Sequence, residues 1–116
     1  MTTSTQQQSS PSQTVVQAWF AAHEAQQADV ELATMTDDVV VIDQDQTYRG
    51  REAARAWISG ASREYTYTTT VLTSGSDGDV TVVTARLEGD FPGGRADLSY
   101  RFRLTGDRIS ALIIGS

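Results

Sequence analysis

Residues 96–104 constrain the fold of this 116-residue chain more than any other segment, because apolar and polar side chains alternate there without a break. One face carries Ala96, Leu98, Tyr100, Phe102 and Leu104, and the other carries Asp97, Ser99, Arg101 and Arg103. A period of two residues predicts a β-strand with one buried face and one face turned to solvent or to a partner. The chain is therefore expected to contain a sheet that is covered on one side only.

Further strands are predicted on both sides of this segment. Residues 65–73 are rich in Tyr, Thr and Val, residues 80–91 continue the strand pattern, and residues 109–114 form the apolar run of a covered strand. Residues 74–79, 92–94 and 105–108 contain the Gly, Pro and Asp typical of turns. On the strand over residues 80–91, Arg86 shares a face with Val82 and Thr84, where it needs a carboxylate partner unless a bulge turns it outward.

The first half of the chain favours helices. Apolar residues at helical spacing predict a helix over residues 12–27, which begins at Pro11 or Ser12. A short helix is predicted over residues 30–35, a short strand over residues 39–43, and a third helix over residues 51–60. This order of elements predicts an α+β domain in which the helices pack on one face of a single sheet.

Composition limits the domain organisation and the possible partners. Residues 1–11 are too polar to pack and are predicted to form a flexible arm, which leaves one domain over residues 12–116. A net charge of −6 without a basic stripe disfavours binding to nucleic acid or to anionic membranes. The first residues show neither a basic region nor an apolar stretch, so we expect a cytoplasmic protein. One histidine and no cysteine disfavour a metal centre, and we expect no cofactor.

Asp43 is the first candidate for a functional residue, because it ends the apolar strand Val39-Val40-Val41-Ile42. A carboxylate at the end of a buried strand is costly unless it is paired, hydrogen-bonded or solvated by a cleft. The alternative to a functional role is that Asp43 is an ordinary carboxylate in a surface turn. Asp45 is a second candidate for the functional carboxylate.

Three segments together resemble the nuclear transport factor 2-like superfamily, and in particular its SnoaL-like (polyketide-cyclase-like) and ketosteroid isomerase-like members. They are VVQAWFAAHEAQQADVELATMTDDVVVID, YRGREAARAW and RFRLTGDRISALII, which cover the chain from Val15 to its end. The resemblance implies a cone-shaped, curved antiparallel sheet with three helices on its concave side around a deep apolar pocket. It also implies a homodimer formed through the outer face of the sheet.

The resemblance also implies roles for individual residues. Asp43 falls where ketosteroid isomerases keep the general base that moves a proton between carbons of a bound ketone. Trp19 falls on the tyrosine donor of the first helix, and Trp does not exchange a proton usefully. Tyr100 falls on the protonated carboxylic acid of the oxyanion hole and can donate through its O–H. Steroid isomerisation is disfavoured by these differences, whereas other proton-transfer chemistry stays open.

The predicted catalytic residues are Asp43, Tyr100 and His23. For Tyr100 the alternative is a core aromatic whose O–H reaches the backbone, and for His23 it is a boundary histidine with a satisfied N–H. The predicted ligand-facing residues are Trp19, Phe20, Tyr48, Trp57, Tyr65, Phe91 and Phe102, although most large aromatics of such a domain fill the core.

Two functions follow from these observations. The first is a cofactor-free acid–base enzyme of the isomerase, cyclase or hydrolase type, acting on an apolar carbonyl or polyketide-like small molecule. The second is a non-catalytic domain that binds an apolar small molecule or forms a dimeric interaction surface.

Overall fold

The computed structural model describes residues 11–60 and 65–115, so most of the predicted arm lies outside the described residues. Its helices are α1 (Pro11–Glu24), α2 (Ala28–Ala33) and α3 (Arg51–Ser59). Its strands are β1 (Met35–Asp43), β2 (Gln46–Arg49), β3 (Tyr67–Asp77), β4 (Val80–Gly89), β5 (Arg95–Thr105) and β6 (Arg108–Gly115). The predicted α+β class is confirmed.

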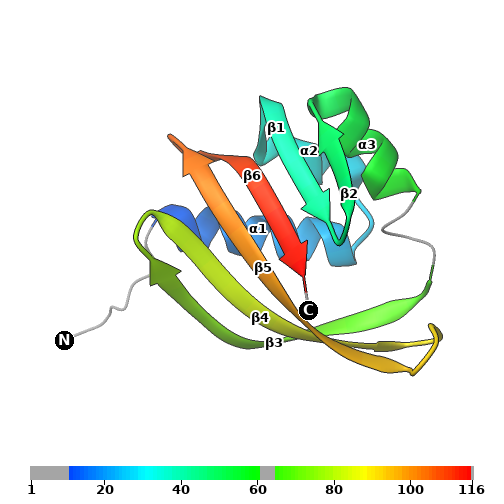
Figure 1. The fold of residues 1–116 in the computed structure, drawn as a ribbon. Helices are drawn as coiled ribbons and strands as arrows, with labels where there is room; N and C mark the ends of the chain where they lie inside the picture. Colours follow the sequence, from blue (N-terminus) through cyan, green and yellow to red (C-terminus); the bar gives the residue numbers. More distant parts are fainter. Residues whose placement is uncertain (1–10, 61–64, 116) are drawn as a thin grey trace.

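The six strands form one sheet in the order β2-β1-β6-β5-β4-β3. Neighbouring strands are antiparallel except for β1, which runs parallel to β6. The long strands β3, β4 and β5 bend strongly, and α1 lies across one face of the sheet (Figure 1). The helices therefore cover the concave side, as the resemblance implies. Within the described residues, no helix has the length and apolar character needed to cross a membrane.

The core lies between α1, α3 and the inner face of the sheet. Trp19 of α1 and Trp57 of α3 are almost completely buried, with nearly parallel rings whose centroids are 6.3 Å apart. From the sheet, Phe102 packs edge-on against Trp19 at 5.4 Å. The alternation predicted for residues 96–104 is confirmed, since Tyr100 and Phe102 are buried while their polar neighbours along β5 face outward.

The largest difference from the sequence-based prediction concerns residues 74–79, which were expected to form a turn. β3 continues to Asp77, and only Gly78 and Asp79 turn the chain. The register of the β3–β4 pair shifts between Val71 and Thr73, and the pairing then continues to Asp77. β3 is an exposed edge strand held by backbone pairing, so its side chains carry little of the apolar signal that marks a strand.

Smaller differences concern the ends of the elements. The first helix ends at Glu24 instead of residue 27, the second spans Ala28–Ala33 instead of residues 30–35, and the third ends at Ser59 instead of residue 60. β1 begins at Met35, four residues before the predicted start, because Met35 pairs with Ile109 of β6. β4 ends at Gly89 instead of Phe91. The ends of elements depend on such tertiary pairing more than on local propensity.

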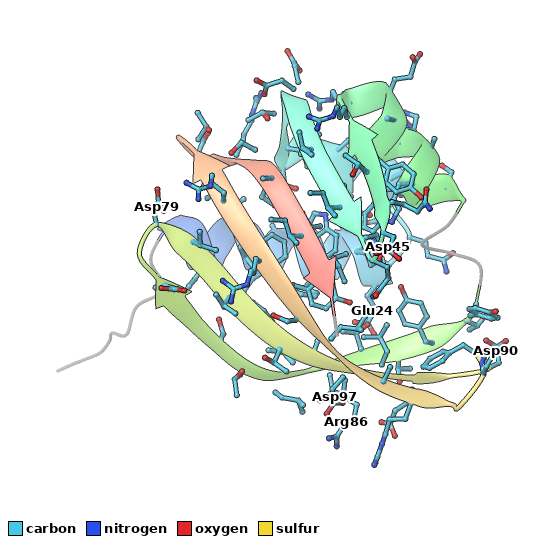
Figure 2. The ribbon with its side chains drawn as sticks, in the orientation of Figure 1. Glu24, Asp45, Asp79, Arg86, Asp90 and Asp97 are labelled. Carbon is cyan, nitrogen blue, oxygen red and sulfur yellow. The ribbon has the colours of Figure 1, made fainter. Side chains whose placement is uncertain are left out.

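The prediction for the inner face of β4 was wrong. Thr81, Val83, Ala85 and Leu87 are the buried residues of this strand, so Arg86 lies on the outer face. There Arg86 meets Asp97 of β5 through two hydrogen bonds of 2.8 and 3.1 Å, on the side of the sheet away from the helices (Figure 2). These hydrogen bonds lower the pKa of the Asp97 carboxyl below its ordinary value.

Two glycines have backbone positions that favour glycine. Gly50 precedes α3 with a φ of 87°, a conformation that favours glycine, and its N–H donates to the carbonyl of Val39 at 2.7 Å. Gly89 lies so close to the start of β3 that a Cβ would overlap the carbonyl oxygen of Thr66. This close approach sets the position of the neighbouring residue Tyr67.

Candidate functional site

Asp43 ends β1, where the chain turns through Gln44 into β2. Gln44 has a φ of 58°, so the turn is tight, and its N–H donates to the carbonyl of Ile114 at 3.1 Å. Trp57 reaches Asp43 from α3, and its Nε1–H donates to Oδ2 at 3.0 Å. The carboxylate is thus half-buried and held by an indole, whereas Asp45 is exposed on the hairpin turn (Figure 2).

Asp43 lines an inner cavity of about 140 Å³ between α1, α3 and the sheet. The residues around this inner cavity are His23, Asp43, Trp57, Tyr65, Tyr67, Leu87, Leu98, Tyr100 and Ile114. The structure therefore brings the three predicted catalytic residues to one cavity. Its wall is mainly apolar or aromatic, which strengthens the electrostatic interactions of the polar groups inside it.

Tyr100 enters the inner cavity from the middle of β5. Burial raises the pKa of its hydroxyl well above the ordinary value, and the nearby Tyr67 and Asp43 raise it further. A phenol with such a pKa stays protonated at neutral pH. Tyr100 can therefore donate a hydrogen bond to a bound oxygen and does not serve as a base.

His23 is held by Glu31, a residue for which the sequence patterns predict no role. Its Nδ1 lies 2.7 Å from Oε2 of Glu31, a residue of α2 with no exposed surface, and its Nε2 lies 3.4 Å from the hydroxyl of Tyr67. The ring of His23 lies nearly parallel to those of Trp19 and Trp57, with centroid distances of 4.6 and 5.6 Å. The only local signal for Glu31 was its place beside Leu32 on the inner side of a short helix.

The predicted ligand-facing aromatics divide into three groups. Trp57 and Tyr65 line the inner cavity. Trp19 and Phe102 have no exposed surface, belong to the core and do not line the inner cavity. A third group lies next to the site: Tyr48 packs against Trp57, Phe91 packs against Tyr65 and Tyr67, and Phe20 lines a different hollow with Val16 and Val83.

Four residues of the inner cavity were absent from the predicted site: Tyr67, Leu87, Leu98 and Ile114. The alternation on β5 could have placed Leu98 on the inner face, and the aromatic content of β3 could have indicated Tyr67. Leu87 was hidden by the wrong choice of face on β4. Across residues 11–60 and 65–115, no cluster of His, Asp and Glu is arranged to hold a metal ion.

Comparisons with known proteins agree with this architecture. Residues 16–112 match the model of the SnoaL-like domain family. A candidate polyketide cyclase from Sinorhizobium meliloti is 31% identical, with a TM-score of 0.83, over 88% of this chain and 94% of its own. No curated protein matches the sequence.

Two more distant structures share the fold. A Mycobacterium tuberculosis protein in complex with estradiol-17beta-hemisuccinate is 21% identical, with a TM-score of 0.78, over 93% of this chain and 95% of its own. A Catenulispora acidiphila protein with a ketosteroid isomerase-like fold, in complex with trimethylamine, is 19% identical, with a TM-score of 0.77, over 88% of this chain and 84% of its own. The chain belongs to the SnoaL-like domain family, within the nuclear transport factor 2-like superfamily.

Proposed function

We propose that this protein binds a small apolar molecule in the inner cavity and catalyses proton transfer on it without a cofactor. The observation that carries the proposal is the shared position of Asp43 and Tyr100 on one apolar cavity, with Trp57 donating to the Asp43 carboxylate at 3.0 Å. Asp43 supplies a proton acceptor and Tyr100 supplies a donor for the charge that develops on oxygen. The neighbouring fold members with bound ligands support a binding role for the cavity.

The proposed step acts on a carbonyl compound. Asp43 takes a proton from the carbon next to the carbonyl, and the electron pair of that C–H bond forms a C=C bond. The π pair of the carbonyl moves to its oxygen, where the hydroxyl of Tyr100 donates a hydrogen bond. Where the enolate is conjugated with a further C=C bond, Asp43 returns the proton to the far carbon of that system while the carbonyl re-forms, which gives isomerisation. Where the enolate carbon instead attacks a second carbonyl carbon of the same molecule, a C–C bond forms and the π pair of that carbonyl moves to its oxygen. This oxygen takes the proton from Asp43, which gives cyclisation.

The size of the inner cavity sets the scale of the substrate. An engineered apolar cavity of about 150 Å³ binds benzene, whereas pockets for drug-sized ligands begin at about 300 Å³. At about 140 Å³, the inner cavity suits a molecule of one or two rings. A steroid such as the one bound by the Mycobacterium tuberculosis protein would extend beyond it.

The proposal is tested with nitrobenzisoxazole, a two-ring compound that opens when a base removes its ring C–H proton. We expect the protein to open this ring faster than an equal concentration of acetate, with para-nitrophenol as a competitive inhibitor. We also expect para-nitrophenol to bind more tightly than estradiol. Ring opening no faster than with acetate would contradict catalysis, and tighter binding of estradiol would contradict the size argument.

A specific observation favours the non-catalytic alternative. Trp19 falls at the position of the tyrosine donor of ketosteroid isomerases. Its Nε1 is buried without a hydrogen-bond partner among the described residues, and Trp19 does not line the inner cavity. One donor of the isomerase arrangement is therefore missing. Binding of para-nitrophenol without any ring opening would assign the protein to this alternative.

The homodimer implied by the resemblance stays a prediction. The outer face of the sheet exposes Ile113 of β6, which is 43% accessible, beside Arg101 and Arg103 of β5. Both arginines form exposed ion pairs, with Asp77 and Asp79 respectively.

A further inference from the structure

Glu31 is a buried carboxylate that the proposed step does not use. Its side chain has no exposed surface, and its only described polar contact is the 2.7 Å interaction of Oε2 with Nδ1 of His23. Oε1 is buried without a hydrogen-bond partner among the described residues. A buried carboxylate that is only half satisfied contributes little to stability, so packing alone does not account for a Glu at this position.

The contact with Glu31 determines which nitrogen of His23 carries a proton. A carboxylate only accepts hydrogen bonds, so Nδ1 must donate to Oε2. A hydrogen bond of 2.7 Å is within the short range of charge-assisted pairs. Nε2 is left facing Tyr67 at 3.4 Å, which is long for an N–H···O bond and holds Nε2 only loosely.

His23 also lies between two hollows. It lines the inner cavity with Asp43, and it lines a second hollow of about 40 Å³ with Glu24, Gln26, Thr66 and Thr69. Tyr65 and Tyr67 are shared by both hollows, and Tyr65 is 40% exposed. A proton-carrying group that lines both hollows can contact a ligand in the inner cavity. It can exchange its proton with solvent through the second hollow.

We propose that the buried Glu31 keeps one ring proton of His23 on Nδ1, so that Nε2 holds the proton that is exchanged. As the imidazolium, His23 delivers this Nε2 proton to an oxygen atom of the bound molecule and is the second proton-transfer group of the inner cavity. Glu31 is a positioning residue in this arrangement, and His23 touches the reacting oxygen. The inference rests on the proposed function of the inner cavity. It also defines the substrate class further, as compounds that lose a C–H proton at one end and gain an O–H proton at the other.

The ring opening of a benzisoxazole shows the balance of this step. Asp43 removes the ring C–H proton, the C–H electron pair forms the π bond of a nitrile, and the N–O bond breaks. The oxygen takes the proton from Nε2 of the His23 imidazolium, which becomes the neutral ring with Nδ1–H still donated to Glu31. Asp43 releases its proton to solvent, and His23 takes one up.

The tautomer of His23 tests the inference without a substrate. His23 is the only histidine of the chain, so its ring signals in a long-range proton–nitrogen correlation spectrum need no assignment. We expect the neutral ring to carry its proton on Nδ1. A neutral ring that carries its proton on Nε2 alone would overturn the inference, whatever the result of any turnover assay.

The second test compares two leaving groups in Glu31→Gln, which keeps the size of the side chain and removes its charge. A nitrobenzisoxazole releases a stable phenolate, so cleavage of its N–O bond needs little assistance from an acid. Unsubstituted benzisoxazole releases a more basic phenolate, so cleavage of its N–O bond needs much more acid assistance. We expect Glu31→Gln to slow the unsubstituted compound about tenfold more than the nitro compound, since general acids contribute about a hundredfold or more. The control is Glu52→Gln, an exposed residue of α3 whose change should leave both rates unaltered.

The two proposals fail in different ways. Equal slowing of both compounds in Glu31→Gln, or no slowing of either, would overturn the role of Glu31 and His23. If Asp43→Asn abolishes turnover in the same assays, the proposed function survives that failure. Full turnover in Asp43→Asn would instead overturn the proposed function, while the tautomer measurement would still decide the state of His23.

Discussion

Replacement of Asp43 by Asn should lower the rate of nitrobenzisoxazole ring opening by about a hundredfold or more. An amide has the shape of a carboxylate but does not accept a proton at neutral pH. The amide oxygen can still accept the hydrogen bond from Nε1 of Trp57, which spans 3.0 Å in the native protein. The fold and the affinity for para-nitrophenol should therefore change little, and kcat should fall while KM stays nearly the same.

The matched control for this change is Asp45→Asn. Asp45 lies two residues further along the same hairpin and is exposed, so its replacement should leave ring opening unaltered. Stopped-flow measurement of phenolate formation gives kcat and KM for both variants. A rate for Asp43→Asn within twofold of the native protein, or a larger loss in Asp45→Asn, would contradict the role of Asp43 as the base.

Replacement of His23 by Phe should destabilise the protein by about 3–5 kcal/mol, the range for leaving a buried carboxylate without its partner. Phe retains the stacking against Trp19 and Trp57 but leaves Glu31 without the contact to Nδ1. Glu31 is completely buried, so solvent does not compensate for the loss. Chemical denaturation followed by tryptophan fluorescence measures the change in the free energy of unfolding.

The double variant His23→Phe, Glu31→Leu supplies the control. It replaces both polar partners by apolar groups, which is often neutral for stability or favourable. We expect its free energy of unfolding to return to within about 1–2 kcal/mol of the native value, so the two changes should be strongly non-additive. Additive losses, or a His23→Phe variant as stable as the native protein, would show that His23 and Glu31 are not coupled in the buried contact that the geometry indicates.

Much of the fold could be predicted from local patterns. The alternation over residues 96–104 assigned the inner and outer faces of β5 correctly, because one face of that strand is buried and the other is wet. The alternation on β4 did not separate the faces, since Val82 and Val83 are both apolar. The last four residues of β3, 74–77, were taken for a turn, because they have the composition of a turn and are exposed along the strand.

The inner cavity was predictable only in part. Asp43 could be singled out because a carboxylate after an apolar strand is unusual, and Tyr100 could be assigned to the inner face of its strand. Glu31 could not be predicted, because an acidic residue on a short helix normally faces solvent. Its contact with His23 arises from the packing of α2 against α1, which no local pattern encodes.

A crystal structure of the protein with para-nitrophenol tests the central claim most directly, because it locates a one-ring ligand relative to Asp43. The account predicts that the ring occupies the inner cavity among Trp57, Leu98 and Ile114. Its phenolic oxygen should lie within hydrogen-bond distance of the Asp43 carboxylate or of the Tyr100 hydroxyl. A ring bound elsewhere on the molecule, with the inner cavity filled by the protein's own side chains and Asp43 turned to bulk water, would contradict it.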